Sequence, residues 1–375
     1  MPPRAVPDRV AIERGSKPLF QRALLRRTGV RFGGERSSAL TVLAAPDLAA
    51  PPVSRIARAI RVTAGLRGAG GLLLILAVLA VFAVRAPSFL DPANLGLILS
   101  QSAVLGILSL GLTLVLITGG TDVIAGGIDL SLAGTLGLSA AVFAGLNQAG
   151  FGDPACAAAA LGTGLAVGLV NAGAILLLRI PPLLATLAVM NICAGLELVV
   201  TENSTIPAAS PLIDALGGTG PLDIPVLGYL LLALALGLAA LLRVTPLGLR
   251  AEAVGGHPAA ARAAGIATGR YVAGSYIASG LLGGVAGIVS VAFLNGATGG
   301  SSEMLLPVVA TAFLGFMVSR RFVPTITGTL LATLFLGSLT NGFQLLHVST
   351  YWVNGIEGAL ILAVVGAGRV RGRAA

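Results

Sequence analysis

The sequence has 375 residues, of which 55% are hydrophobic and 10% are charged, and it contains 52 glycines. A water-soluble domain cannot bury that much apolar surface, so the composition indicates a membrane protein with several spans. The formal net charge of +9 belongs entirely to residues 1–68, because the rest of the chain has equal numbers of basic and acidic residues. That basic tail has few aromatic residues, which disfavours nucleic acid as a partner and favours a cytoplasmic tail beside an anionic lipid bilayer.

Ten apolar segments are long enough to cross a bilayer as helices. They lie near 69–86, 95–117, 128–146, 154–178, 182–200, 225–242, 271–294, 305–319, 323–345 and 350–367. With ten spans and the basic tail inside, nearly all remaining arginines fall in cytoplasmic connections, as the positive-inside rule requires. The predicted fold is therefore an all-α polytopic membrane protein with about ten transmembrane helices and both termini cytoplasmic.

This reading divides the chain into three parts. Residues 1–68 form a basic, disordered cytoplasmic tail, residues 69–368 form the transmembrane domain, and residues 369–375 form a cytoplasmic C-terminal tail. Within the transmembrane domain, residues 243–270 form the longest cytoplasmic connection, which is too short to be a nucleotide-hydrolysing module.

Motifs for chemistry are scarce. The chain has no GxxxxGK[ST] phosphate loop, its two cysteines (Cys156 and Cys193) lie in apolar runs, and its two histidines (His257 and His347) lie far apart. We therefore expect no enzyme activity, no metal site and no cofactor bound by this chain.

The stretch "GGTDVIAGGIDLS" at 119–131 places two glycine pairs and two aspartates at the start of the third predicted span. A calcium-binding reading would require more tandem copies of a glycine-rich nonapeptide, and a catalytic reading would require further converging groups. A structural turn with Gly126, Gly127 and Asp129 is favoured instead, in which Asp129 caps the third span.

Polar residues inside the predicted spans are more informative than the glycines at helical spacing, which we expect to pack helices together. About half of them should form interhelical hydrogen bonds rather than line a pathway. Glu197 and Glu357 are the ionisable ones, and their positions near predicted outer ends weaken the hypothesis of a proton-coupled carrier. The set is Asn171, Thr186, Asn191, Glu197, Asn341, Gln344 and Glu357.

The cytoplasmic connection contains "PAAARAAG", which predicts a helix of one or two turns that begins at Pro258 and is stopped by Gly265. A helix this short cannot stand alone, so it must dock either on its own bundle or on a partner protein. His257, just before it, is more often a solvated or capping residue than a ligand.

Five stretches in order from about Phe89 to about Val365 resemble successive signatures of the ribose-type sugar ABC transporter permeases. They are "TLVLITGGTDVIAGGIDLSLAGTLGLSAAV", "LVNAGAILLLRIPPLLATLAVMNICAGLELV", "TPLGLRAEAVGGHPAAARAAGI", "EMLLPVVATAFLG" and "GTLLATLFLGSLTNGFQLLHVSTYW". The resemblance implies a permease domain at 69–368, with a coupling segment at 243–270 that holds the short helix fitting a cleft of the ATPase.

The resemblance also implies partners. These are a cytoplasmic sugar-type ABC ATPase that binds ATP and Mg, a periplasmic or extracellular sugar-binding protein, and a second permease copy as a homodimer or a close paralogue. The implied location is the bacterial inner membrane. The residues implied to couple to the ATPase are Gly255, Gly256, His257, Pro258, Ala261, Arg262, Gly265 and Ile266.

Three departures from the family pattern mark a divergent member. About six residues that include Asp122 are inserted before the family aspartate, which corresponds to Asp129. The segment from Phe316 to Pro324 replaces a glycine-rich turn and introduces Arg320 and Arg321. The 68-residue basic lead matches nothing in the family.

The expected function is that of the permease subunit of an ATP-driven importer of a simple sugar or polyol, working by alternating access. Alternatives are an ABC permease for branched-chain amino acids or nucleosides and, less favoured, a proton-coupled secondary transporter. Neutral polar groups would contact the sugar hydroxyls, and aromatic rings, including Phe143, would stack on the sugar. The expected pathway residues are Asn171, Thr186, Asn191, Asn341, Gln344, Tyr351 and Trp352.

Overall fold

A computed structural model describes residues 75–120, 127–319 and 323–348, together with positions 352, 355, 356, 358 and 359. Of positions 317 and 318 only the backbone is described. These residues all belong to one compact unit, Ala57–Ala375. Several predictions lie outside the described residues: both tails, Asp122 and Gly126, Arg320 and Arg321, Tyr351 and Glu357.

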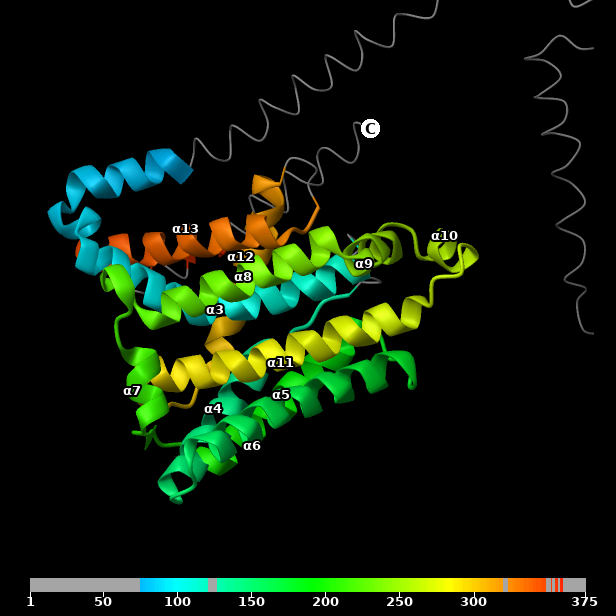
Figure 1. Cartoon of the computed structure of the whole chain (residues 1–375), viewed down its shortest axis with the longest axis horizontal. Coiled ribbons are helices and arrows are strands. Elements are labelled where there is room, and N and C mark those ends of the chain that lie inside the picture. The colour runs from blue at the N-terminus through cyan, green and yellow to red at the C-terminus, as the bar shows by residue number, and fades with distance from the viewer. Residues whose placement is uncertain are drawn as a thin grey trace, which may run out of the picture. The chain divides into compact units, whose positions relative to one another are not determined.

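The described part of the chain is helical almost throughout (Figure 1). It opens with a helix over Ile75–Arg85. The further elements are η1 (Pro87–Leu90), α3 (Pro92–Gly119), α4 (Leu132–Gln148), α5 (Asp153–Leu176), α6 (Pro182–Thr201), β1 (Ile206–Pro207), α7 (Pro211–Gly217), η2 (Pro221–Asp223), α8 (Val226–Val244), α9 (Pro246–Gly256), α10 (Pro258–Ala263), α11 (Thr268–Leu294), β2 (Gly296–Ala297), η3 (Ser301–Met304), α12 (Leu305–Val318) and α13 (Ile326–Leu345).

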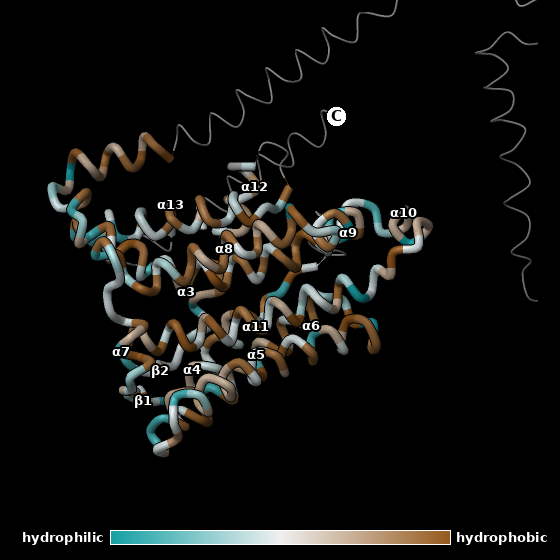
Figure 2. Tube along the Cα trace, viewed as in Figure 1, coloured by the Kyte–Doolittle hydropathy of each residue, from teal (hydrophilic) through white to brown (hydrophobic). Residues whose placement is uncertain are grey.

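Six of the described helices are long and apolar enough to cross a membrane: α3, α5, α6, α8, α11 and α13. Hydrophobic positions run along these helices, and hydrophilic positions are most frequent at helix ends and in connections (Figure 2). A multi-pass helical membrane protein is thus confirmed. The helices in the predicted spans near 69–86, 128–146 and 305–319 are shorter than these six. They are the helix over Ile75–Arg85, α4 with 17 residues and α12 with 14. The count of ten spans and the cytoplasmic termini stay predictions.

The helix α3 forms the centre of the bundle. Within its apolar window 94% of residues are buried, against about a third or less in α5, α6 and α8. It packs against α8, α9, α11, α12 and α13. The other helices leave apolar side chains such as Leu184, Ile192 and Val199 of α6 exposed, as lipid contact allows.

The helices α5 and α11 approach each other backbone to backbone. A Cβ on Gly164 would collide with the carbonyl oxygen of Gly280, and a Cβ on Gly280 would collide with that of Gly164. A Cβ on Gly168 would likewise collide with the backbone of Tyr276 and Ile277. The packing role predicted for glycines at helical spacing is confirmed at these positions. It is not confirmed at Gly162 of α5, whose added Cβ would meet no atom of the described residues within 4 Å.

The two ends of the bundle are built differently (Figure 1). One end carries α9 and α10, which belong to the segment expected to couple to an ATPase, and for that reason we call it the coupling end. The other end carries α7 and the two short strands, where β1 pairs antiparallel with β2 through Ile206 with Ala297 and Pro207 with Gly296.

Candidate functional site: the coupling end and a buried polar cluster

The helix α10 is built as its sequence predicts. Pro258 lies in its first turn, where the missing N–H costs nothing. Gly265 has φ +81°, and the chain leaves the helix there through two hydrogen bonds, Gly265 N–H to Arg262 O (3.0 Å) and Ile266 N–H to Ala261 O (3.0 Å). This closing pattern requires a left-handed residue, which explains the glycine at position 265.

One side of α10 is anchored and the other is free. Ala261 is buried, whereas Pro258, Ala259, Ala260 and Arg262 are exposed. His257 is exposed as well, and its side chain makes no capping hydrogen bond to α10, so of its two expected roles only solvation is realised. The result is a small exposed surface of short side chains beside Arg262 that a concave partner can cover.

Four glycines connect α9 to the central helix, and we call them the glycine junction: Gly119, Gly120, Gly127 and Gly255. A Cβ on Gly255 would collide with the backbone oxygen of Ile117, at the end of α3. A Cβ on Gly120, which has φ +77°, would collide with the oxygen of Gly255. Gly119 contacts Gly127 in the same way, so the end of α9, the end of α3 and the turn before α4 meet without side chains.

The turn after Gly127 carries a buried polar cluster. Asp129 is 1% exposed. Its Oδ1 accepts hydrogen bonds from the Ser131 amide (3.0 Å) and hydroxyl (2.6 Å), and its Oδ2 accepts one from the Ser279 hydroxyl of α11 (2.7 Å). Asn171 of α5 donates to Ser131 Oγ at 2.7 Å.

The expectation that Asp129 caps the third span is therefore wrong. The residue at the N-cap of α4 is Ser131, and its own side chain makes no capping hydrogen bond to the helix. Asp129 lies two residues earlier, and its carboxylate bonds to the chain just before the helix and to α11 instead. The structural-turn prediction for Gly127 and Asp129 agrees with this geometry.

Two more bonds fix the same turn. The backbone oxygen of Ile128 accepts from Thr186 Oγ1 of α6 (3.4 Å) and from the Tyr276 hydroxyl of α11 (3.3 Å). Together with the Asp129 cluster, these bonds hold the turn to α5, α6 and α11 at once. If α9 moved relative to α3, the glycine junction would pass that movement to this turn. The turn would pass it to the three spans to which it bonds.

The expected pathway residues are not gathered in one place. Asn171 and Thr186 meet at the Asp129 turn. Asn341 of α13 pairs with Asn94 at the start of α3 through two amide hydrogen bonds of 2.9 Å each. Asn191, Gln344 and Trp352 are exposed, and Phe143 is buried in the main core instead of lining a pathway.

Glu197 of α6 is the buried ionisable residue at the end opposite to the coupling end. It is 2% exposed, and its carboxylate accepts hydrogen bonds from the amide and the hydroxyl of Ser301 in η3. Gly137 of α4 leaves the space that the carboxylate occupies. Its contacts tie α4, α6 and η3 together.

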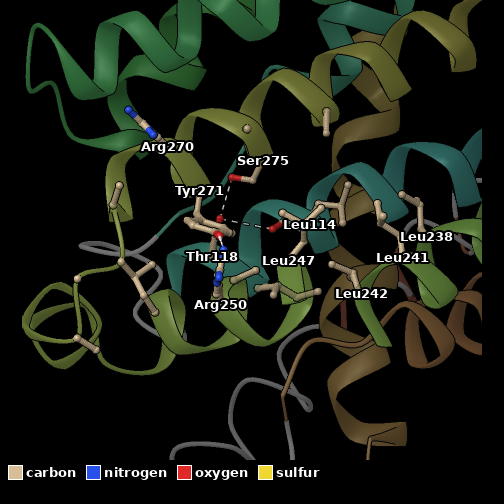
Figure 3. A pocket seen from close by; sticks show the side chains of 18 residues that line it. Leu114, Thr118, Leu238, Leu241, Leu242, Leu247, Arg250, Arg270, Tyr271 and Ser275 are labelled. Carbon is tan, nitrogen blue, oxygen red and sulfur yellow. Dashed lines mark hydrogen bonds between the residues drawn. The ribbon is translucent and has the colours of Figure 1, made fainter. Parts of the chain in front are cut away.

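A cavity of about 720 Å³ opens at the coupling end, among α3, α8, α9 and α11 (Figure 3). The residues along it include Leu238 and Leu242 of α8, Arg250 of α9, and Arg270 and Tyr271 of α11. None of the expected pathway residues that the structure describes borders it. Among the described residues, no group of three His, Cys, Asp or Glu side chains is placed to hold a metal ion.

Sequence reasoning missed the hydroxyl partners of this site. Ser279 and Tyr276 lie in an apolar span, and so does Ser275, whose hydroxyl accepts a 2.7 Å hydrogen bond from Thr118 of α3. Serines and threonines occur in most spans of this chain, so only their positions in space distinguish the ones that bond to the turn.

The comparisons with known proteins agree on one kind of protein. The family model described as branched-chain amino acid transport system, permease component, matches residues 94–365. The chain is 34% identical to the ribose import permease protein of Bacillus subtilis, over 76% of this chain and 87% of that protein. It is 33% identical to the ribose import permease protein of Escherichia coli K12, over 78% and 91%.

A third relative, the autoinducer 2 import system permease protein of Photorhabdus luminescens, is 28% identical over 78% of this chain and 87% of its own length. No solved structure matches the chain.

Proposed function

The chain belongs to the family of ABC transporter permease components described for branched-chain amino acid transport systems, and we propose that it imports a simple sugar or polyol. As a permease component it is a transport subunit and not an enzyme. ATP and Mg would bind to a separate cytoplasmic ATPase, and the permease would move between inward-open and outward-open states.

One observation carries the coupling part of this proposal. The helix α10 presents its short exposed side chains away from the bundle, while α9, the helix that precedes it, meets α3 through Gly255. A push on α10 would therefore be passed to the central helix and, through Gly127, to the turn that bonds to α5, α6 and α11. The coupling residues from Gly255 to Ile266 are proposed on this ground.

The proposed substrate class rests on charge. Asp129 and Glu197 are the acidic groups buried in the described part of the chain, and each accepts hydrogen bonds from serines. A zwitterionic amino acid would need fixed charges along its path, whereas an uncharged sugar needs hydroxyl and amide groups. The names of the ribose relatives point to the same class.

The proposed assembly contains two permease copies, a cytoplasmic ATPase and an extracytoplasmic binding protein, in a bacterial inner membrane. In this arrangement the coupling end faces the cytoplasm, which places Arg243, Arg250, Arg262 and Arg270 on the side that the positive-inside rule favours.

Transport in proteoliposomes tests the substrate class. The chain would be reconstituted with its cognate ATPase and binding protein, and uptake of labelled ribose would be compared with uptake of labelled leucine. The proposal expects ATP-dependent accumulation of the sugar and none of leucine. Accumulation of leucine without the sugar would overturn the substrate class and favour the amino acid alternative.

A further inference from the structure

The cavity at the coupling end is amphipathic. Its apolar wall is formed mainly by leucines, and its two arginines lie away from that wall. Figure 3 shows Leu238, Leu241 and Leu242 on one side, and Arg250 and Arg270 on the other. A volume of about 720 Å³ falls within the range of about 300 to 1,000 Å³ that small-molecule pockets have.

The two sides lie at different depths along the helices. Leu238 is well inside α8, which ends at Val244, and Leu114 is more than one turn before the end of α3 at Gly119. Arg250 belongs to α9, after the end of that span, and Arg270 lies in the first turn of α11. The apolar wall is thus at membrane depth, and the arginines are at the membrane surface.

The charge of the cavity is unbalanced. Arg250 and Arg270 are exposed, and Arg250 contacts only the Tyr271 hydroxyl, at 3.5 Å, among the hydrogen bonds of the described residues. The described residues that line the cavity include no aspartate or glutamate. Arg250 and the Tyr271 hydroxyl form a pair of donors suited to a phosphate. Arg270, which points away from them in Figure 3, adds a second positive charge to the cavity wall.

We propose that this cavity binds one anionic phospholipid, with its phosphate at Arg250 and the Tyr271 hydroxyl and an acyl chain along Leu238, Leu241 and Leu242. Arg270 adds positive charge that attracts the same headgroup. Basic pockets between transmembrane helices on the cytoplasmic side favour such headgroups. The proposal rests on the placement of the coupling end at the cytoplasmic surface. The lipid would touch both α9 and α11, which flank α10, so it would support the segment that meets the ATPase.

A sugar is a poor occupant, because most of the lining side chains are apolar and could not satisfy its hydroxyls. A free phosphate would use the arginines but would leave the leucine wall empty. A zwitterionic phospholipid would fill the wall, but its cationic headgroup would meet the arginines unfavourably. The charge and the wall together therefore select an anionic lipid.

Native mass spectrometry of the purified chain, without ATPase, binding protein or sugar, tests the proposal. The chain would be offered phosphatidylglycerol and phosphatidylcholine with identical acyl chains. Wild type is expected to retain phosphatidylglycerol preferentially. R250Q/R270Q should lose that preference by roughly thirtyfold, since each arginine near the surface is worth about fivefold.

Three controls make the result specific. R179Q/R243Q removes the same charge from the same end but changes no residue of the cavity, so it should keep the preference. Ala278→Trp fills the cavity and keeps both arginines, so it should lose lipid retention. An excess of glycerol 1-phosphate should not displace the lipid, because it has no acyl chain.

Equal loss in R179Q/R243Q and R250Q/R270Q would overturn the proposal, as would displacement by glycerol 1-phosphate or full retention by Ala278→Trp. Circular dichroism and size-exclusion chromatography would show whether each variant is folded. R250K/R270K keeps the charge and should keep the preference even if the glutamine variant does not fold. The measurement involves no transport, so its failure would leave the importer proposal unaffected.

Discussion

At the scale of single residues, the polar groups of this protein mostly hold helices together. Asp129 bonds to Ser131 and Ser279, and Asn341 bonds to Asn94. The sequence predicts that about half of its polar span residues would act this way, and it locates Asp129 at a turn. It could not identify Ser279 as a partner, because that contact joins residues 150 positions apart.

The Asp129 cluster leads to the first prediction. Asp129→Ala leaves the Ser131 amide, the Ser131 hydroxyl and the Ser279 hydroxyl without their acceptor, at about 1–3 kcal/mol for each stranded group. Asp129→Asn keeps one acceptor oxygen, and its new amide can donate to Ser279, so it should cost much less. Thermal unfolding of the detergent-solubilised permease would measure these costs, and the melting temperature should fall in the order wild type, Asp129→Asn, Asp129→Ala.

The exposed Asp214 of α7 supplies the control, because Asp214→Ala should cost no more than about 1 kcal/mol. Uptake should follow stability in this series. If Asp129→Asn were as stable as wild type but inactive, Asp129 would have a charge-dependent role in transport, and the structural account of the cluster would be wrong.

The glycine junction gives the second prediction, and the chain itself provides a matched control. Gly255→Ala places a methyl group against the oxygen of Ile117, whereas Gly256→Ala meets no atom of the described residues within 4 Å. Such overpacking costs about 1–3 kcal/mol and would push α9 away from α3. Gly255→Ala should therefore reduce ATP-dependent uptake while the ATPase still co-purifies, because the exposed face of α10 is unchanged.

Gly256→Ala should have nearly wild-type uptake. Equal uptake by the two alanine variants would show that contact between α9 and α3 does not transmit the motion. Loss of ATPase co-purification in Gly255→Ala would show that the substitution disturbs docking instead of coupling.

At the scale of elements, hydropathy predicts where helices lie but not which one is central. The apolar windows of α3 and α6 have the same mean hydropathy, 2.1, although 94% of the first and 28% of the second is buried. Lipid and the protein interior are both apolar, so the composition of a helix does not show which of the two surrounds it. The small helix α10 was predictable because proline and glycine mark its two ends.

The contact between α5 and α11 gives the third prediction. Gly164→Leu would force the backbones of the two helices apart at Gly280, whereas Gly162→Leu projects from the exposed side of α5. We expect the first variant to lower the melting temperature strongly and the second to leave it near that of wild type. Fluorescence-detected size-exclusion chromatography after heating would compare them, and equal melting temperatures would contradict the packing.

At the scale of the whole molecule, five sequence stretches were enough to predict the family, and the comparisons confirm it. They could not predict the cavity at the coupling end, since it depends on how α3, α8, α9 and α11 are spaced. The expected pathway residues were chosen by their polarity, and they lie in different parts of the structure. Polarity along a helix does not reveal which face meets the substrate.

Orientation in the membrane is the fourth prediction. Leu222 is 88% exposed in η2, and Ala263 is exposed in α10, at the opposite end. The native cysteines are both buried. In intact spheroplasts a membrane-impermeant maleimide should label Leu222→Cys, and it should label Ala263→Cys only after permeabilisation. The reverse pattern would place α10 outside the cytoplasm and exclude an ATPase as its partner.

The central claim is that an ATPase drives this permease from the cytoplasm, and the energy source of uptake tests it most directly. The initial rate of labelled ribose uptake would be measured in proteoliposomes that contain the permease, its ATPase and its binding protein. We predict uptake that requires internal ATP and is unchanged by a protonophore. Uptake that persists without ATP under an imposed proton gradient, and that the protonophore abolishes, would contradict the account and identify a proton-coupled carrier.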